Sequence, residues 1–531
     1  MNKMPLDKAI NAAISTGLLW DTSEYATVDK DRIKLSDAFI RRRDEIIKGY
    51  SHSSGYASAK KGRLIAAIIV AAIISLSTIT VMAIDPIRDS VFSFFSELNQ
   101  SKNPTQTEQT APLTPPPGVE YSKGLEFELS EDGSYYILKN SGQCSDKAIY
   151  IPPTYNDLPV KVIGEKAFKR CSAKNIFIPE GVERIEKNAF WGCKSIYIQL
   201  PDSLTYIGEY AFSTCSFEVI HLGDNIEYIG QNAFSSCRSL KKVVLPSKLT
   251  SVEPSTFSHC MALEELVVSD SVISFKDSAF SGCVSLEIIT FGNSVVSIGS
   301  GAFRGCENLR QVIFPESVEE IGIGAFGGCE SLKSVTFGSN IKTIGGGAFA
   351  SCSNLVSITI PDSVEHLGNN AFSQCYRLKN VVLSKNITSI GDFTFRDCHR
   401  LVSITLPENV ESIGAQAFYG CKSLKEINIP EGVKTVGSLV FSNCDALESI
   451  SFPDGIETFE INFINACKNL KEITIGKGVK SIGSFLPQNL PNLSVIKFRG
   501  TEEEWNSIKN KPTNSLKDIT IEFEAQESET N

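Results

Sequence analysis

Hydrophobic residues recur through most of the chain in a frame of 22 or 23 residues. In the stretch that begins at Cys306, the apolar positions are Leu309, Val312 and Phe314, and Pro315 follows them. The alternation of Val312, Ile313 and Phe314 predicts a short strand with one outward side chain. Pro315 ends the strand because proline has no N–H to donate to a ladder.

The second half of each unit has a different spacing. After Pro315, apolar or small residues fall at about every third position, at Val318, Ile321-Gly322 and Ala325-Phe326, before the next cysteine. This spacing favours tight turns or a second short ladder over a long helix. We interpret the Ala-Phe pair as one short helical turn that places its aromatic ring inward.

Cysteines give the period of the repeat. They are 23 residues apart from Cys237 to Cys467 and 22 residues apart from Cys171 to Cys237, and Cys144 precedes Cys171 by 27. The longer first step is a 22-residue unit with a five-residue insertion. All 15 cysteines of the chain lie in this series.

A unit of this size cannot bury its own apolar side, so neighbouring units must cover it. We therefore predict a β-rich parallel solenoid of 22–23-residue units with short helical turns. Its interior is expected to contain the repeated aromatic and thiol positions, among them Phe280, Phe303, Phe326, Phe349, Cys306, Cys329 and Cys352.

The thiols are predicted to be free and buried. Equivalent side chains of stacked units point the same way, whereas a disulfide needs convergent ones. One cysteine per unit without a C-x-x-C pair also gives no zinc site, so no metal is expected.

Both ends of the repeat region contain candidate caps. Residues 120–170 are expected to form an N-terminal cap with the first repeat, with a hairpin at Asp132-Gly133. The solenoid then covers 171–490. Residues 491–525 form a C-terminal cap, in which Thr501 and Glu504 match a capping box and Trp505 covers the last layer, and 526–531 are a tail.

Residues 64–84 are 21 positions without a charge, enough for one transmembrane helix. Residues 1–63 contain 12 Lys and Arg against 8 Asp and Glu, a net charge of +4. Because the whole chain has a net charge of −10, the residues after 63 have a net charge of −14. The positive-inside rule then places the N-terminus in the cytosol and the repeats outside. Cleavage of a secretory signal near Val81-Met82-Ala83 is the alternative, but the charged leader is too long for a signal peptide.

Three segments flank the predicted span. Residues 1–63 are expected to contain short cytosolic helices, and 85–98 an amphipathic helix at the outer leaflet or, alternatively, an oligomer contact. Residues 99–119 are rich in proline, threonine and glutamine and predict an extended linker.

Candidate chemistry is sparse. Residues 321–329 contain a G-x-G-x-x-G, but only one unit has all three glycines and the first is the one that persists among the units, so we interpret the segment as a repeat turn and not a nucleotide site. The five histidines do not converge with a nucleophile and a base. We therefore predict no enzyme and no cofactor. Nucleic acid is disfavoured because the repeat side is acidic.

One column of outward strand positions is free of charge and is the candidate binding face. A flat, uncharged column of this kind is typical of a surface that docks a protein or glycan; the alternative is that β-branched residues are favoured at strand positions for structural reasons alone. The residues assigned to this face are Thr290, Ile313, Thr336, Thr359, Val382 and Thr405.

From about residue 120 to 525 the chain resembles the BspA-like leucine-rich repeats of bacterial cell-surface proteins. The resemblance rests on the "IGxxAFxxC" frame, the "LxxIxIP" strand, the opening "YYILKNSGQCSDKAIYIPPTYNDLPVKVIGEKAF" and the closing "FRGTEEEWNSI". It implies a leucine-rich repeat fold and adhesion or surface binding, without a shared ligand site. The units that depart from the frame, at Val252-Glu253, Phe275-Lys276, Phe459-Glu460 and Phe463-Ile464, are expected to be locally irregular.

Two hypotheses about function follow. The first is a single-pass cell-membrane protein, anchored by 64–84, whose outer repeats bind an extracellular protein or glycan. The second is a transmembrane sensor whose segment 1–63 holds a cytosolic regulatory protein, because this part is similar to the membrane-anchored anti-sigma-like proteins of Gram-positive bacteria. The other reading of 1–63 is an anchor with a basic, lipid-facing flank.

Overall fold

The computed structural model describes residues 115–524, apart from 117–118, 484–488, 511–515 and 517, and two short strands near the N-terminus. The chain divides into two units, Met1–Ala111 and Pro112–Asn531. In the first unit, β1 (Ala26–Asp29) pairs with β2 (Arg32–Leu35) in antiparallel register. The sequence did not predict this strand pair, and the short helices expected within 1–63 lie almost wholly outside the described residues.

The remaining predictions for the first 119 residues fall on positions that the structure does not describe. These are the span at 64–84, the amphipathic helix at 85–98 and all but three residues of the linker at 99–119. The tail at 526–531 also lies outside the described residues. Within the described part of the chain, no helix has the length and apolar character needed to cross a bilayer.

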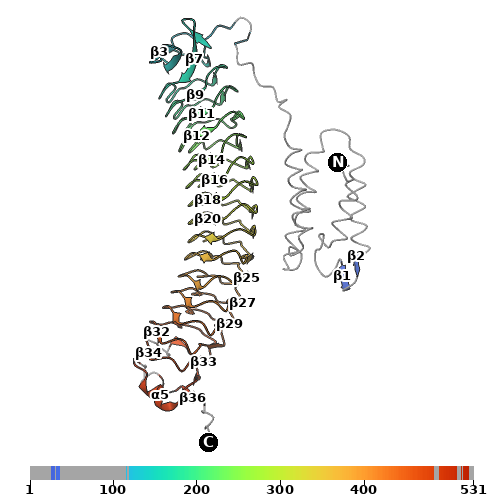
Figure 1. Ribbon diagram of the computed structural model, residues 1–531, viewed down its shortest axis with the longest axis vertical. Helices are drawn as coiled ribbons and strands as arrows, with labels where there is room; N and C mark the ends of the chain where they lie inside the picture. Colours follow the sequence, from blue (N-terminus) through green and yellow to red (C-terminus); the bar gives the residue numbers. More distant parts are fainter. Residues whose placement is uncertain are drawn as a thin grey trace. The chain divides into compact units, whose positions relative to one another are not determined.

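The second unit is a β-solenoid of about 16 turns of the leucine-rich repeat type, which confirms the predicted fold of the repeat region (Figure 1). Two columns of short strands follow its length. The first column contains β5 (Ala148–Tyr150), β8 (Asn175–Phe177), β10 (Tyr197–Gln199), β13 (Lys242–Val244), β15 (Glu265–Val267), β17 (Ile288–Thr290), β19 (Gln311–Ile313), β21 (Ser334–Thr336), β23 (Ser357–Thr359), β25 (Asn380–Val382), β27 (Ser403–Thr405), β29 (Glu426–Asn428), β31 (Ser449–Ser451), β33 (Glu472–Ile475), β35 (Val495–Phe498) and β36 (Thr520–Phe523).

The second column consists mostly of two-residue strands that end at the Ile position of the Ile-Gly pair. The sequence left a second short ladder open as one of two readings, and the structure selects it. Its members are β7 (Leu158–Ile163), β9 (Arg184–Ile185), β11 (Tyr206–Ile207), β12 (Tyr228–Ile229), β14 (Ser251–Val252), β16 (Ser274–Phe275), β18 (Ser297–Ile298), β20 (Glu320–Ile321), β22 (Thr343–Ile344), β24 (His366–Leu367), β26 (Ser389–Ile390), β28 (Ser412–Ile413), β30 (Thr435–Val436), β32 (Thr458–Phe459) and β34 (Ser481–Ile482).

Equivalent residues of consecutive turns pair in parallel. In the first column Val312 lies opposite Val335, 23 residues later, and in the second Ile321 lies opposite Ile344. The same step separates the cysteines, so one turn of the solenoid corresponds to one unit of the sequence. The strand interiors are buried while their flanking residues face outward, as the alternation predicted.

The Ala-Phe segment is not a helical turn, and this part of the prediction was wrong. It consists of successive four-residue turns, each closed by a backbone hydrogen bond. The Ala302 N–H donates to the Gly299 carbonyl at 3.2 Å, and the Cys306 N–H donates to the Phe303 carbonyl at 3.3 Å. The residues before Ala and before Cys have a positive φ, as at Gly301 (59°) and Gly305 (71°). A left-handed residue at these two places interrupts a right-handed helix.

The strands of the units that depart from the frame keep the regular register, contrary to expectation. Val252 and Phe275 pair with each other in the second column, and Phe275 continues to Ile298 in the same register. Phe459 pairs with Ile482 in the same way. In the last departing unit, Phe463 accepts the N–H of Phe441 at 3.1 Å, so the bond between turns is kept where the residue types change.

Thirteen phenylalanines, from Phe168 to Phe441, form one stack along the interior. Neighbouring rings lie 4.9–5.8 Å apart between centroids and are tilted by at most 13°. Every one of these side chains is fully buried. In the middle turns a second row, Phe291, Phe314 and Phe337, packs edge-on against the first. Offset stacking of this kind adds to the burial of the rings.

The N-terminal cap covers the first turn with two hairpins. β3 (Glu126–Leu129) pairs antiparallel with β4 (Tyr136–Asn140), which confirms the hairpin predicted at Asp132-Gly133. The five-residue insertion forms a second, unpredicted hairpin, in which β6 (Thr154–Tyr155) pairs with the start of β7. Its Tyr155 ring stacks on Phe127 at 4.3 Å and joins the two hairpins.

The C-terminal cap is built around α5 (Glu502–Ser507). Thr501 and Glu504 form the predicted capping box, with each side chain accepting the backbone N–H of the other residue. Trp505 is 6% exposed and its ring lies 5.4 Å from that of Phe498, so it covers the last layer as predicted. The chain then adds β36, which pairs parallel with β35 and was not predicted.

The ring stack generates a stability prediction. Phe326→Ala should lower the free energy of unfolding by about 3–5 kcal/mol, because the fully buried ring leaves a cavity. Phe393→Ala is the matched control: this half-buried ring lies outside the stack, and its loss should cost about 1 kcal/mol or less. Denaturant unfolding followed by circular dichroism measures both, and equal costs would contradict a buried stack.

Candidate binding surfaces

The buried cysteines do more than fill space. Each of the twelve from Cys215 to Cys467 donates its S–H to the carbonyl of the phenylalanine in the preceding turn, at Sγ–O distances of 2.8–3.4 Å. The same carbonyl accepts the N–H of the cysteine in its own turn, as at Phe303. The thiol therefore occupies the second acceptor site of a buried carbonyl.

The predicted state of the thiols is confirmed: all 15 are free, and 13 of them are buried. Burial raises the pKa of Cys237, Cys306 and Cys375 to about 12, because the thiolate loses its hydration. These groups stay protonated at neutral pH, as donors must.

The first three cysteines depart from this pattern. Cys144 and Cys171 are partly exposed, and Cys193 contacts the hydroxyl of Ser195 at 3.2 Å. A hydrogen bond from Cys193 lowers the pKa of Cys171 to about 6, and the same bond together with burial raises that of Cys193. Burial raises the pKa of Cys144. Cys171 is thus the most nucleophilic thiol of the three near neutral pH.

The G-x-G-x-x-G stretch serves turn packing. A Cβ on Gly322 would lie 2.7 Å from the backbone of Gly299 and Ser300 in the preceding turn, which explains why this glycine recurs. Gly324 has φ +61°, but Asn370 adopts the same angle at the equivalent place. No helix follows the glycines, so the segment lacks the helix N-terminus that holds a pyrophosphate.

The histidines of the repeat region lie in different turns, as expected. Of these, His399 lies 3.6 Å from the carboxylate of Asp397 and 5.1 Å from the ring of Tyr376. Across the described residues, no group of three or more His, Cys, Asp or Glu side chains is arranged to hold a metal ion.

The structure brings the six predicted face residues together in one column. Each is the third residue of its strand, in the six successive strands from β17 to β27. Ile313 lies opposite Thr336, and Thr359 lies opposite Val382, in the same parallel register. Thr290, Thr359, Val382 and Thr405 are exposed, while Ile313 and Thr336 are half-buried by their neighbours.

A second outward column runs beside the first, and sequence reasoning missed it. The first residue of each strand also faces outward, and over the same six strands none is charged. These residues are Ile288, Gln311, Ser334, Ser357, Asn380 and Ser403. We call these twelve residues together the outer sheet face. The sequence does contain the signal. In a three-residue strand with a buried central residue, the residues on both sides of it face outward, and not only the one after it.

Charges gather outside this face. Beside the second strand column, Lys342 pairs with Glu319 at 3.0 Å, and Lys434 pairs with Glu411 at 2.9 Å. Both pairs join consecutive turns. The outer sheet face is therefore an uncharged strip on a solenoid whose other surfaces are charged.

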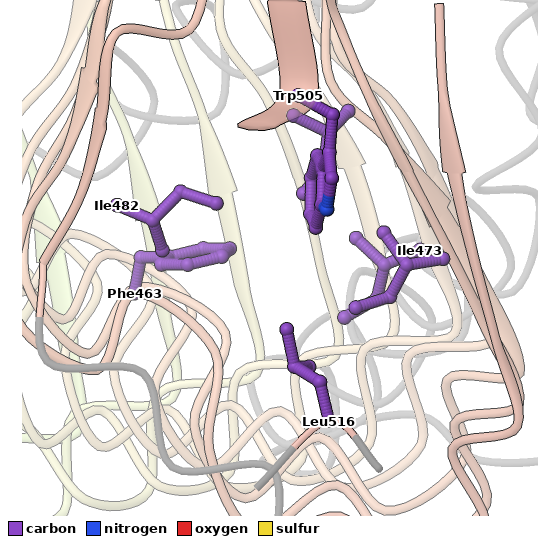
Figure 2. Close-up of a pocket in the computed structure, with 7 residues that line it drawn as sticks. Phe463, Ile473, Ile482, Trp505 and Leu516 are labelled. Atoms are coloured by element: carbon purple, nitrogen blue, oxygen red, sulfur yellow. The ribbon is translucent and has the colours of Figure 1, made fainter. Parts of the chain in front are cut away.

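The C-terminal cap encloses a small apolar void (Figure 2). Its volume is about 10 Å³, and Phe463, Ile473, Ile482, Trp505 and Leu516 are among the residues that line it. This volume holds at most about one water molecule. The void is a packing gap beneath Trp505 and not a ligand site.

A protein-family model described as "BspA type Leucine rich repeat region" matches residues 161–287, 274–402 and 388–517. No curated protein sequence matches the chain. Among solved structures, 40 chains match.

Several of these structures are of bacterial proteins, and three of them are described here. A leucine-rich repeat protein from Bacteroides ovatus is 21% identical, with 77% of this chain and 99% of that one covered and a TM-score of 0.47. A leucine rich cell surface protein from Faecalibacterium prausnitzii is 22% identical, with 75% and 99% covered and a TM-score of 0.39. The pneumococcal vaccine antigen PcpA is 18% identical, with 76% and 98% covered and a TM-score of 0.35.

The thiol environments predict a reactivity pattern. A thiol reagent should modify two of the 15 cysteines in the native protein, Cys144 and Cys171, and all 15 after denaturation. Cys171 should react first and keep its rate as the pH falls toward 6, because its thiolate persists there, whereas the rate at Cys144 should fall steeply. Cys171→Ser should remove the fast phase alone. Rapid modification of most thiols in the folded chain would contradict the buried ladder.

Proposed function

Because the chain belongs to the BspA-type leucine-rich repeat family, we propose that it is a single-pass cell-surface protein whose repeats bind an extracellular protein or glycan. The outer sheet face is the surface proposed to bind. The observation that carries this assignment is the absence of charge from all twelve positions of the outer sheet face, which are the first and third residues of six successive strands.

An uncharged face costs little to dehydrate. The centres of protein interfaces are depleted of charged residues for this reason. Hydroxyls and amides such as those of Thr359, Ser357 and Asn380 supply hydrogen bonds at the same time, and Val382 and Ile288 add exposed apolar area. The face therefore suits an extended partner that makes many weak contacts along the strands.

Anchoring belongs to the same proposal. The uncharged segment 64–84, with basic residues before it, supports a single span with the repeats outside the cell. The sensor hypothesis differs only in the role of 1–63. Specific capture of a sigma factor or another regulator by these residues would favour sensing, and capture of none would favour plain anchoring.

Charge placed on the outer sheet face should weaken binding. We expect the full-length chain, immobilised on a surface-plasmon-resonance chip, to bind at least one member of a panel of extracellular matrix proteins and glycans. Thr359→Glu with Thr405→Glu should weaken that interaction about tenfold or more, because each carboxylate must be dehydrated in the complex. Thr435→Glu, an exposed threonine of the second strand column, is the matched control.

The outcome that rejects this face is equally clear. If the double variant binds as the unmodified chain does, or if Thr435→Glu weakens binding as much, the partner contacts another surface.

A further inference from the structure

Over six successive turns, one edge of the solenoid carries positive charge only. This edge is formed by one five-residue segment around the cysteine of each turn. Each segment begins at the residue after the stacked phenylalanine and ends at the second residue after the cysteine. In the first six turns of this kind it contains four cations, Lys169, Arg170, Lys194 and Arg238, and no Asp or Glu. The six segments are 169–173, 191–195, 213–217, 235–239, 258–262 and 281–285. The next turn brings the first carboxylate, Glu307. Four cations without an anion are unexpected in a chain of net charge −10.

Hydrogen bonds between turns place these residues in line. The N–H of Arg170 donates to the Trp191 carbonyl, that of Gly192 to Ser213 and that of Thr214 to Ser235, each at 2.8 Å. Arg170, Gly192 and Thr214 are therefore equivalent positions of consecutive turns. A Cβ on Gly192 would lie 3.4 Å from Cγ of Arg170 and 3.5 Å from Oγ1 of Thr214. The side chains of Arg170 and Thr214 therefore both border the position of Gly192.

A notch continues this line. It has a volume of about 320 Å³ and is open to solvent. The lining residues are Thr214, Cys215, Ser216, Ser236, Arg238 and Ser239. It lies where 22-residue units give way to 23-residue units: one residue separates Cys215 from the next buried side chain, Phe217, whereas two separate Cys237 from Leu240. The extra residue sets the later turn off from the earlier one.

The cations of this edge are not neutralised. Among the described residues, none of Lys169, Arg170, Lys194 and Arg238 has a carboxylate within ion-pair distance, although neighbouring cations such as Lys187 and Lys241 do. The Trp191 ring holds two of them, with Nζ of Lys169 and the guanidinium carbon of Arg170 each 4.9 Å from its centroid. Cations held in place without a counter-charge select an anionic ligand.

We propose that this edge, which we call the basic edge (Lys169, Arg170, Lys194, Thr214, Ser216 and Arg238), binds an anionic saccharide that carries sulfate or carboxylate groups. Guanidinium groups pair with sulfate or carboxylate through two parallel hydrogen bonds. The serine and threonine hydroxyls of the notch donate to and accept from sugar hydroxyls. Successive turns are about 4.8 Å apart, so a chain with repeated charges meets several cations at once.

Other polyanions fit less well. A single-stranded nucleic acid needs free aromatic faces for base stacking, and Trp191 already contacts two cations. An acidic peptide would use the cations but has no polyhydroxylated surface to match the hydroxyls of Thr214, Ser216 and Ser236 in the notch.

The choice of a saccharide rests on the proposed extracellular placement of the repeats, but the surface does not. The basic edge shares no residue with the outer sheet face, so the two binding surfaces succeed or fail separately. Thr359→Glu with Thr405→Glu should leave saccharide binding unchanged.

The test measures binding of a heparin-derived tetrasaccharide to the purified full-length chain by fluorescence anisotropy, beside the same tetrasaccharide after desulfation. Arg238→Ala and Arg170→Ala should each weaken binding about tenfold, the effect of losing one charge-assisted contact. Arg377→Ala is the matched control, because Arg377 is an exposed arginine that lies on the same side of the solenoid, six units beyond Arg238 and outside the basic edge. Both test residues are exposed, so their loss should leave the melting temperature unchanged.

Three results would overturn the proposal. The first is absent binding, or equal binding of the desulfated tetrasaccharide. The second is an equal loss in Arg377→Ala, which would indicate attraction by overall charge. The third is tighter binding of an acidic peptide of the same charge, also weakened by Arg238→Ala, which would assign the basic edge to a protein ligand.

Discussion

The structure depends on hydrogen bonds that leave each turn incomplete without the next. In the Ala-Phe-x-x-Cys segment, the phenylalanine N–H donates to the following turn, as from Phe303 to the Ala325 carbonyl at 2.8 Å. The phenylalanine carbonyl also accepts the S–H of the cysteine in the following turn; Cys329 donates to the Phe303 carbonyl at 3.3 Å. Both groups are buried, and an unpaired buried polar group costs free energy. Register between turns is therefore fixed at the ring and the thiol together.

A fixed interior leaves the exterior free to vary. Two surfaces of the same solenoid differ in charge because their residues contact solvent and not the ring stack. The outer sheet face, between Ile288 and Thr405, carries no charged residue, whereas the basic edge, between Lys169 and Arg238, carries cations alone. Both follow columns of equivalent positions, which makes them long and narrow. Such shapes suit extended partners more than small compact ligands.

Much of the fold could be predicted from the sequence because period and register are the same quantity in a solenoid. Cysteine spacing gave the turn length, and the position of Phe326 gave the ring stack. The backbone of the turns could not be predicted, because left-handed φ is adopted by Arg170 and Leu439 as well as by glycine, so no residue type signals it. The hydrogen bond from each thiol to a carbonyl was missed for a similar reason. A cysteine that only fills space and a cysteine that donates its S–H cannot be told apart in the sequence. The basic edge could not be found from the sequence because its four cations come from three separate turns of the solenoid.

Residue-resolved amide hydrogen exchange on the full-length chain tests the central claim most directly. If the turns are joined through the ring stack, the phenylalanine amides from Phe190 to Phe418 should exchange slowest, with protection highest in the middle turns and falling toward both caps. If amides such as those of Phe303 and Phe326 exchange at the rate of solvent-exposed surface turns, the turns are not held together in this way and the account fails.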